Sequence, residues 1–164
     1  MTESEQLASR MREVIFSGTW VAGTNFKAQL TDLNWESASL KVGSVNSIAA
    51  LTSHIHYYVA GILNVLKGGT LDIKDKYSFD FPPLASKRDW DKVVELFFKD
   101  SEEFITKVAL LSDKDLDSVF VDKRYGSYRR NIDALIEHAY YHLGQIVLLK
   151  KMRNQDSTKA LPPT

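Results

Sequence analysis

The sequence contains no cysteine, which excludes disulfide bonds, thiolate metal ligands and a cysteine nucleophile. Its 21 basic residues are balanced by 21 acidic residues, so there is no net field to attract nucleic acid or an anionic membrane surface. No apolar run approaches the roughly 18 residues of a membrane span, and residues 1–13 lack the apolar stretch of a signal peptide. We therefore expect a cytoplasmic protein that binds neither nucleic acid nor membranes.

The length of 164 residues suits one domain with a single core. Apolar residues recur at helical spacing over 4–15, 45–67, 86–111 and 130–152, and a short helix is expected over 32–40. Ser44 and Ser86 are candidate N-caps, and the glycines at 68 and 69 mark a helix end. Residues 1–153 are therefore predicted to form one all-α domain, a four-helix bundle with long connections, followed by a disordered tail over 154–164.

Two of the connections carry further information. Residues 68–86 exceed the usual length of an unstructured connection, and they include three aromatic residues that need a place to bury. This segment could cover a site as a lid. Residues 119–121 could pair briefly as extended chain within the connection 112–129.

The four histidines are confined to two of the predicted helices, as the pairs His54/His56 and His138/His142. Residues four apart share one face of a helix at about 6 Å, so His138 and His142 could reach one metal ion. A third ligand is needed, because catalytic zinc usually has about three protein ligands and structural zinc four. His54 and His56 diverge by about 200° on a helix. The small residues on the His54 face leave room for an ion, so His54 is preferred and His56 is the reserve.

A purely structural interpretation also has to be weighed. A histidine on an apolar helix face is more often a core residue that donates to a carbonyl group than a ligand, and the spacing H-x-x-x-H arises by chance in many helices. From the residues alone, the two interpretations carry roughly equal weight. The concentration of every histidine in two apolar helices favours metal binding.

The segment 137–146 reads E-H-A-Y-Y-H-L-G-Q-I and resembles the H-x-x-x-H-x-G-Q signature of the DinB/YfiT-like superfamily of metal-binding four-helix bundles. The G-T-W at 18–20, the segment 47–55 and the long connection 68–86 also resemble that superfamily, so the similarity covers nearly the whole chain. It implies one divalent metal ion, typically nickel or zinc, and a ligand set that consists of His54, His138 and His142.

One departure from the family pattern is the histidine at position 56, which leaves a swapped ligand or a supporting role open. Gln145 shares a helix face with His142 and could hydrogen-bond a ligand or simply pack between helices. The tyrosines beside the histidines could line a pocket or belong to the core, and they are Tyr57, Tyr58, Tyr140 and Tyr141.

Three imidazoles with an open position allow a metal ion to activate a water molecule or a thiol. The resemblance therefore implies a metal-dependent hydrolase or a low-molecular-weight-thiol S-transferase, with an unknown small-molecule substrate. Neither Glu137 nor Asp133 is placed for a catalytic role, so no general base is predicted. A thiol cofactor could be anchored by a basic cluster that is otherwise a solvated surface, formed by Lys123, Arg124, Arg129 and Arg130.

The alternative is a non-catalytic, stress-linked bundle that binds a metal or another ligand. A homodimer is expected from the habit of the family and from the frequency of twofold symmetry.

Overall fold

The computed structural model describes residues 1–159, with side chains through residue 153. This part of the chain is mostly helical, with seven α-helices and no strand, so the all-α prediction is confirmed. The longer helices are α1 (Glu3–Arg12), α4 (Ile48–Leu66), α5 (Lys87–Ala109) and α7 (Tyr128–Lys159). Three short helices complete the set, namely α2 (Phe26–Leu30), α3 (Trp35–Ser39) and α6 (Asp113–Asp117).

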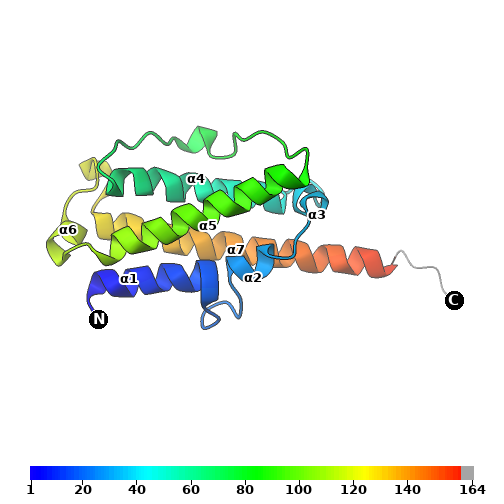
Figure 1. Ribbon diagram of the computed structural model, residues 1–164, viewed down its shortest axis with the longest axis horizontal. Helices are drawn as coiled ribbons and strands as arrows, with labels where there is room; N and C mark the ends of the chain where they lie inside the picture. Colours follow the sequence, from blue (N-terminus) through cyan, green and yellow to red (C-terminus); the bar gives the residue numbers. More distant parts are fainter. Residues whose placement is uncertain (160–164) are drawn as a thin grey trace.

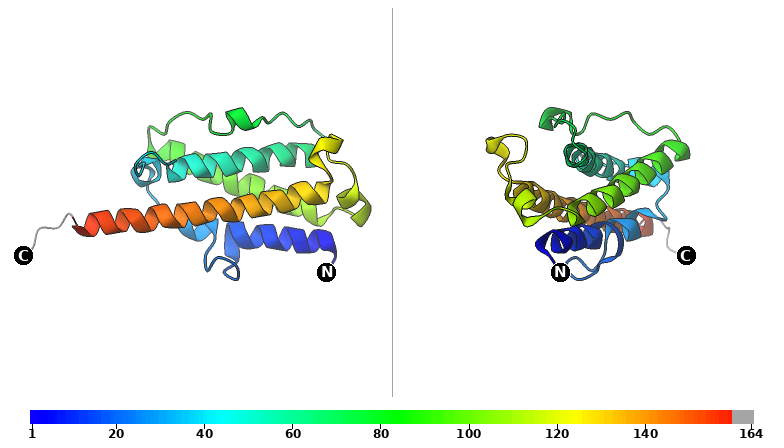
Figure 2. Two further views of the ribbon diagram at one scale, coloured as in Figure 1. Left: turned by 180° about the vertical axis from the view of Figure 1, so that it is seen from behind. Right: turned by 60° about the vertical axis from the view of Figure 1, so that its left-hand side comes forward.

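The four longer helices lie side by side (Figure 1). Their contacts form a ring, since α1 packs on α5, α5 on α4, α4 on α7 and α7 on α1. Along the chain, α4 and α5 run in one direction, while α1 and α7 run in the opposite direction (Figure 1). A parallel pair needs a connection that returns along the whole first helix, which for the 19 residues of α4 is about 28 Å. The long connection 67–86 meets this need and passes along the outside of α4 (Figures 1 and 2).

The ends of the longer helices follow from local capping. Ser86 caps α5 as predicted, because its hydroxyl accepts a hydrogen bond from a backbone amide of the first turn at 3.3 Å. The predicted cap Ser44 is wrong, because Ser44 lies in a turn and the hydroxyl of Ser47 accepts the corresponding bond of α4 at 3.2 Å. Gly68 follows α4 with φ of 86°, a left-handed conformation that favours glycine.

Several short elements differ from the predicted helices. The single-turn helices α2 and α6 begin at their own side-chain caps, Asn25 and Ser112. Residues Glu13–Ser17 form a π-helical turn after α1, and an isolated β-bridge joins Val119 to Ser127 in the segment where brief extended pairing was predicted. Helix α7 continues to Lys159 and takes in the first part of the predicted tail, whereas residues 160–164 lie outside the described residues.

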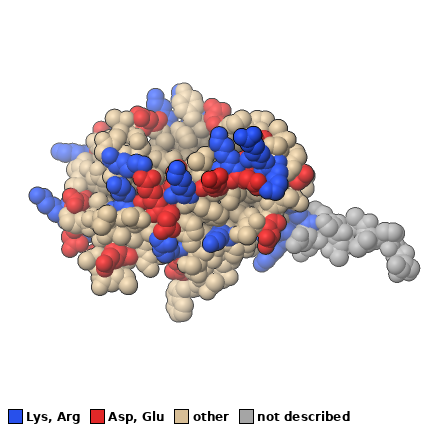
Figure 3. Space-filling view, viewed as in Figure 1, with Lys and Arg blue, Asp and Glu red and all other residues tan. Residues whose placement is uncertain are grey.

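The apolar core fills the space between the four longer helices. Its largest fully buried side chains include Phe97 and Phe104 of α5, and the Phe97 ring meets Phe26 edge-on at 5.2 Å between centroids. On the face shown in Figure 3, basic and acidic side chains are interspersed, without a large area of one sign. Across residues 1–159, no helix combines the length and the apolar character needed to cross a bilayer.

Candidate metal centre

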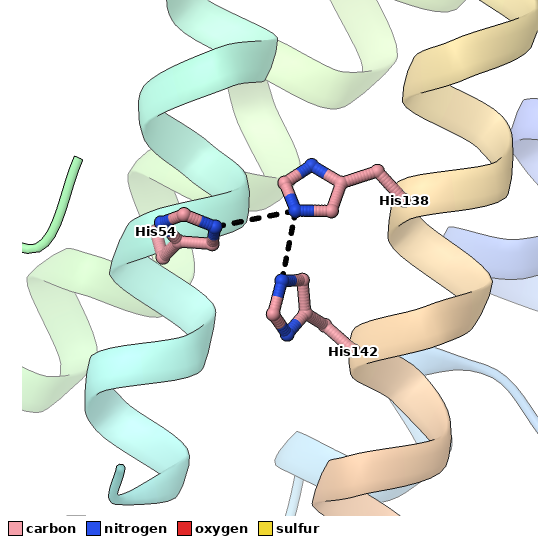
Figure 4. A group of neighbouring side chains, drawn as sticks. All are labelled: His54, His138 and His142. Atoms are coloured by element: carbon pink, nitrogen blue, oxygen red, sulfur yellow. Dashed lines mark hydrogen bonds between the residues drawn. The ribbon is translucent and has the colours of Figure 1, made fainter. Parts of the chain in front are cut away.

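Three of the four histidines meet between α4 and α7 (Figure 4). His54 comes from the middle of α4, and His138 and His142 come from successive turns of α7. The Nε2 atom of His138 lies 3.2 Å from Nε2 of His54 and 2.8 Å from Nε2 of His142. One ligand nitrogen of each residue lies within 4.8 Å of the others, close enough for all three to bind one metal ion. We call these residues the three-histidine cluster.

The outer nitrogens of two of these rings define their tautomers. Nδ1 of His54 lies 3.1 Å from the carbonyl oxygen of Ser78, and a carbonyl can only accept, so Nδ1 carries the proton. Nδ1 of His142 lies 2.6 Å from Oε1 of Gln145 and donates in the same way. A neutral imidazole has one N–H, so both Nε2 atoms present lone pairs to His138. This is the arrangement in which supporting hydrogen bonds orient metal-binding histidines.

The inward nitrogens have the chemistry and spacing that a divalent cation requires. Lone pairs that face each other at about 3 Å repel unless a proton or a cation lies between them. Bonds of about 2.0–2.1 Å in tetrahedral zinc sites place ligand nitrogens about 3.3 Å apart. The separations of 2.8 and 3.2 Å lie just below this value, and all three ligand nitrogens lie within 4.8 Å of one another, so modest side-chain movements would let them bind one ion.

Burial keeps the cluster in its neutral form, which is the form that binds metals. His54 and His142 are 6% and 5% exposed. Burial lowers the pKa of both rings, and their bonds to Ser78 and Gln145 offset part of this effect. Burial, together with repulsion from the two neighbouring histidines, lowers the pKa of His138 to about 4. The three imidazoles are therefore neutral at physiological pH, and metal binding does not have to displace ionising protons from them.

The connection 67–86 forms one wall of the site. The Phe79 ring stacks on His54 with centroids 3.9 Å apart and planes 9° from parallel. The predicted cover over the site therefore has specific contacts, although sequence reasoning missed the Ser78 carbonyl because backbone acceptors leave no residue-type signal. Gly61 allows this close approach, since a Cβ atom there would lie 2.5 Å from the side chain of Ile73.

Tyr58 forms a second wall, one helical turn after His54. Its ring lies edge-on to both His54 and His138, with centroids 5.1 Å away in each case. The Tyr58 hydroxyl donates to Oδ1 of Asp75 at 2.9 Å and ties the connection to α4. Burial raises the pKa of Tyr58, so the hydroxyl stays protonated at neutral pH.

The other predicted tyrosines have different positions. Tyr141 lies on the exposed side of α7, with its ring 4.8 Å from that of His142. Tyr57 bonds through its hydroxyl to the backbone of Lys74 and so anchors the connection. Tyr140 lies on another side of α7, near Glu13, and does not line the site.

His56 does not join the cluster. It projects from a different side of α4, where its Nε2 lies 2.7 Å from Oδ2 of Asp100 on α5. The reserve ligand is therefore a residue of the α4–α5 contact. The two acidic residues judged unsuitable as bases are also engaged elsewhere, because Asp133 pairs with Arg10 at 2.6 Å and Glu137 lies 3.7 Å from Arg130.

Three of the four residues of the basic cluster proposed as a thiol anchor form ion pairs with acidic residues of the same protein. Arg124 pairs with Asp122, and Arg129 pairs with Asp117 and Glu3. These contacts favour the interpretation as a charged surface.

No family model, curated protein or solved structure matches this chain. The DinB/YfiT-like resemblance thus rests on the sequence motif, and the metal centre rests on the geometry of the three-histidine cluster.

Proposed function

We propose that this chain is a metal-dependent hydrolase of the DinB/YfiT-like kind, in which the three-histidine cluster holds one divalent ion, nickel or zinc. The observation that carries the proposal is the convergence of three buried, neutral imidazoles, two of which are fixed with their Nε2 lone pairs inward. The ring of contacts among α1, α5, α4 and α7 supports a four-helix bundle, a fold in which such sites are assembled from facing helices.

A divalent ion held by three imidazoles would retain an open position and supply Lewis acidity for attack on a carbonyl or amide. The protein residues orient and enclose that position. Ser78 and Gln145 hold the histidine tautomers, while the Phe79 ring covers His54 and limits access of solvent. The protonated Tyr58 hydroxyl stands at the rim and keeps Asp75 in place.

Hydrolysis is preferred over thiol transfer because two arginines of the charged anchor expected for a thiol cofactor, Arg124 and Arg129, form ion pairs within the protein. A homodimer, a cytoplasmic location and a small-molecule substrate belong to the same proposal and rest on the sequence resemblance.

The direct test is elemental analysis of protein purified without a histidine tag. Wild type is compared with His54→Ala, His142→Ala and the matched control His56→Ala, which removes the same side chain from α4 outside the cluster. We expect near-stoichiometric nickel or zinc in wild type and His56→Ala, and loss in the other two variants. Metal-loaded wild type is then assayed against a panel of ester and amide substrates and for transfer of a small thiol to electrophilic acceptors, with His142→Ala as the blank.

Three outcomes are informative. Metal in the expected variants with turnover that disappears in His142→Ala supports the hydrolase. Metal without turnover on esters, amides or thiol acceptors supports the non-catalytic binding protein. A wild type that takes up neither zinc nor nickel when they are added refutes the metal centre.

A further inference from the structure

An apolar groove lies between α7 and residues 42–51, and it shares Gln145 with the surroundings of the three-histidine cluster. Its volume is about 400 Å³, within the range of small-molecule sites. The apolar side chains that line it are Val42, Val45, Leu51, Leu148, Leu149 and Met152. Three of these large side chains are strongly exposed, namely Val45 at 51%, Leu148 at 57% and Met152 at 40%.

The groove lies at one end of the three-histidine cluster. Leu51 lies one turn before His54 on α4, and Gln145 lies one turn after His142 on α7. Because α4 and α7 run in opposite directions, both residues lie at the same end of the cluster (Figure 1). Each is displaced from its histidine by about 4.5 Å along the helix axis, and Met152 by about 15 Å. Along α7 the groove thus spans roughly 10 Å, from about 4.5 Å to about 15 Å beyond His142.

Gln145 belongs to both sites. Its side chain lines the groove, and its Oε1 accepts the hydrogen bond from Nδ1 of His142. An occupant of the groove would therefore contact the residue that orients a metal ligand. This contact links the apolar surface to the chemistry of the site.

The lining identifies the chemistry of the occupant. Charged residues make up 26% of the sequence, yet the groove is lined only by apolar residues and the neutral side chains of Ser44, Asn46 and Gln145. A charged group would lose hydration there without an ionic partner. An uncharged aliphatic or aryl body fits, since it would cover the exposed surface of Val45, Leu148 and Met152.

We propose that the groove binds the uncharged, apolar body of a small-molecule substrate whose polar, metal-seeking group lies at the three-histidine cluster. This inference rests on the proposed metal-dependent function and narrows its substrate class to compounds with an apolar chain or ring beside the reacting group. Short polar substrates would leave the groove empty and bind weakly.

The test uses two hydroxamates with the same metal-binding group, acetohydroxamate and octanohydroxamate, titrated calorimetrically into metal-loaded protein. Each buried methylene contributes about threefold to fourfold in affinity. Because the groove is open to solvent, we expect octanohydroxamate to bind at least about 30-fold more tightly than acetohydroxamate.

Two variants place a charge on opposite walls of the groove, Leu148→Glu on α7 and Val45→Asp in the segment before α4. The control is Leu110→Glu, an exposed leucine beyond α5 at the other end of the molecule. In both groove variants, we expect the gain in affinity from acetohydroxamate to octanohydroxamate to fall at least tenfold. The affinity for acetohydroxamate and the metal content should stay unchanged. The control keeps the full gain.

Equal affinity for the two hydroxamates, or a gain that survives in both groove variants, overturns the proposal. If the metal centre itself fails, the protein contains no metal and does not bind acetohydroxamate, which distinguishes that result from failure of the groove proposal. In that case, the groove is tested alone by NMR titration with 1-octanol, which has no strong metal-binding group. Shifts at the Leu148 and Met152 methyl groups support an apolar ligand site. Their absence, together with a concentration-dependent dimer lost in Leu148→Glu, assigns the face to a second copy and overturns the proposal.

Discussion

Removal of the hydrogen-bond acceptor of Gln145, without loss of side-chain volume, tests whether the tautomer of His142 matters for metal binding. The substitution Gln145→Met leaves Nδ1–H of His142 without the partner that now lies 2.6 Å away. The ring is then free to turn or to change tautomer, and either change moves the Nε2 lone pair away from the cluster. Loss of such a supporting partner typically weakens metal affinity about 10- to 100-fold.

This loss corresponds to about 1.4–2.7 kcal/mol of binding free energy. The value agrees with the cost of about 1–3 kcal/mol for leaving a buried donor unsatisfied, and His142 is 5% exposed. The assay is a competition titration of metal-free protein with zinc and a chromophoric chelator at neutral pH. Urea unfolding of the metal-free protein shows whether the variant remains folded.

The matched control is Gln145→Glu, which keeps an acceptor oxygen and adds a negative charge near the ion. We expect it to bind zinc at least as tightly as wild type. The reasoning is refuted if Gln145→Met binds zinc within threefold of wild type, or if Gln145→Glu is weakened as much as Gln145→Met. Either result would mean that packing between α4 and α7, and not the hydrogen bond, fixes the His142 ring.

Other predictions concern the cover, the protonation and the core. Phe79→Ala removes the ring stacked on His54 and should speed metal release into excess chelator several-fold in stopped-flow measurements, with Phe81→Ala as a control from the same connection. Because burial lowers the pKa of each histidine in the cluster, that of His138 to about 4, the unfolded chain binds more protons than the folded protein between about pH 6.5 and about pH 4. The contribution of these histidines to the free energy of unfolding of the metal-free protein should therefore be fully present above pH 6.5. It should be lost as the pH falls through that range, as followed by urea unfolding at about pH 7.5 and about pH 5. Phe97→Ala removes a fully buried ring of the core and should lower the free energy of unfolding by about 3–5 kcal/mol in the same assay.

The longer helices and most of the three-histidine cluster could be predicted from the sequence, because both show the three- to four-residue spacing of an α-helix. Helical periodicity over 86–111 predicts α5, and Ser86 marks its start. The spacing of His138 and His142 places both rings on one face of α7. His54 and His56 diverge by about 200°, so His54 joins the cluster while His56 contacts Asp100 of α5. These inferences depend only on geometry within one helix.

Features that depend on contacts between distant segments left weaker signals. Ser44 and Ser47 both have side chains suited to capping, and the turn that contains Ser44 decides between them. The helices α2 and α6 are one turn long, too short for a periodic pattern to show. The role of the Ser78 carbonyl follows from the path of the connection, not from the serine side chain.

The connection also explains why a long, irregular segment lies at the metal centre. The parallel direction of α4 and α5 forces residues 67–86 to travel along α4, so the middle of this segment must pass the middle of the helix. His54 occupies that middle position, and it meets Ser78 and Phe79 there. A ligand at the middle of α4 therefore acquires a carbonyl acceptor and an aromatic cover as a result of the topology. In this arrangement the crossover connection between α4 and α5 also orients His54, one member of the three-histidine cluster.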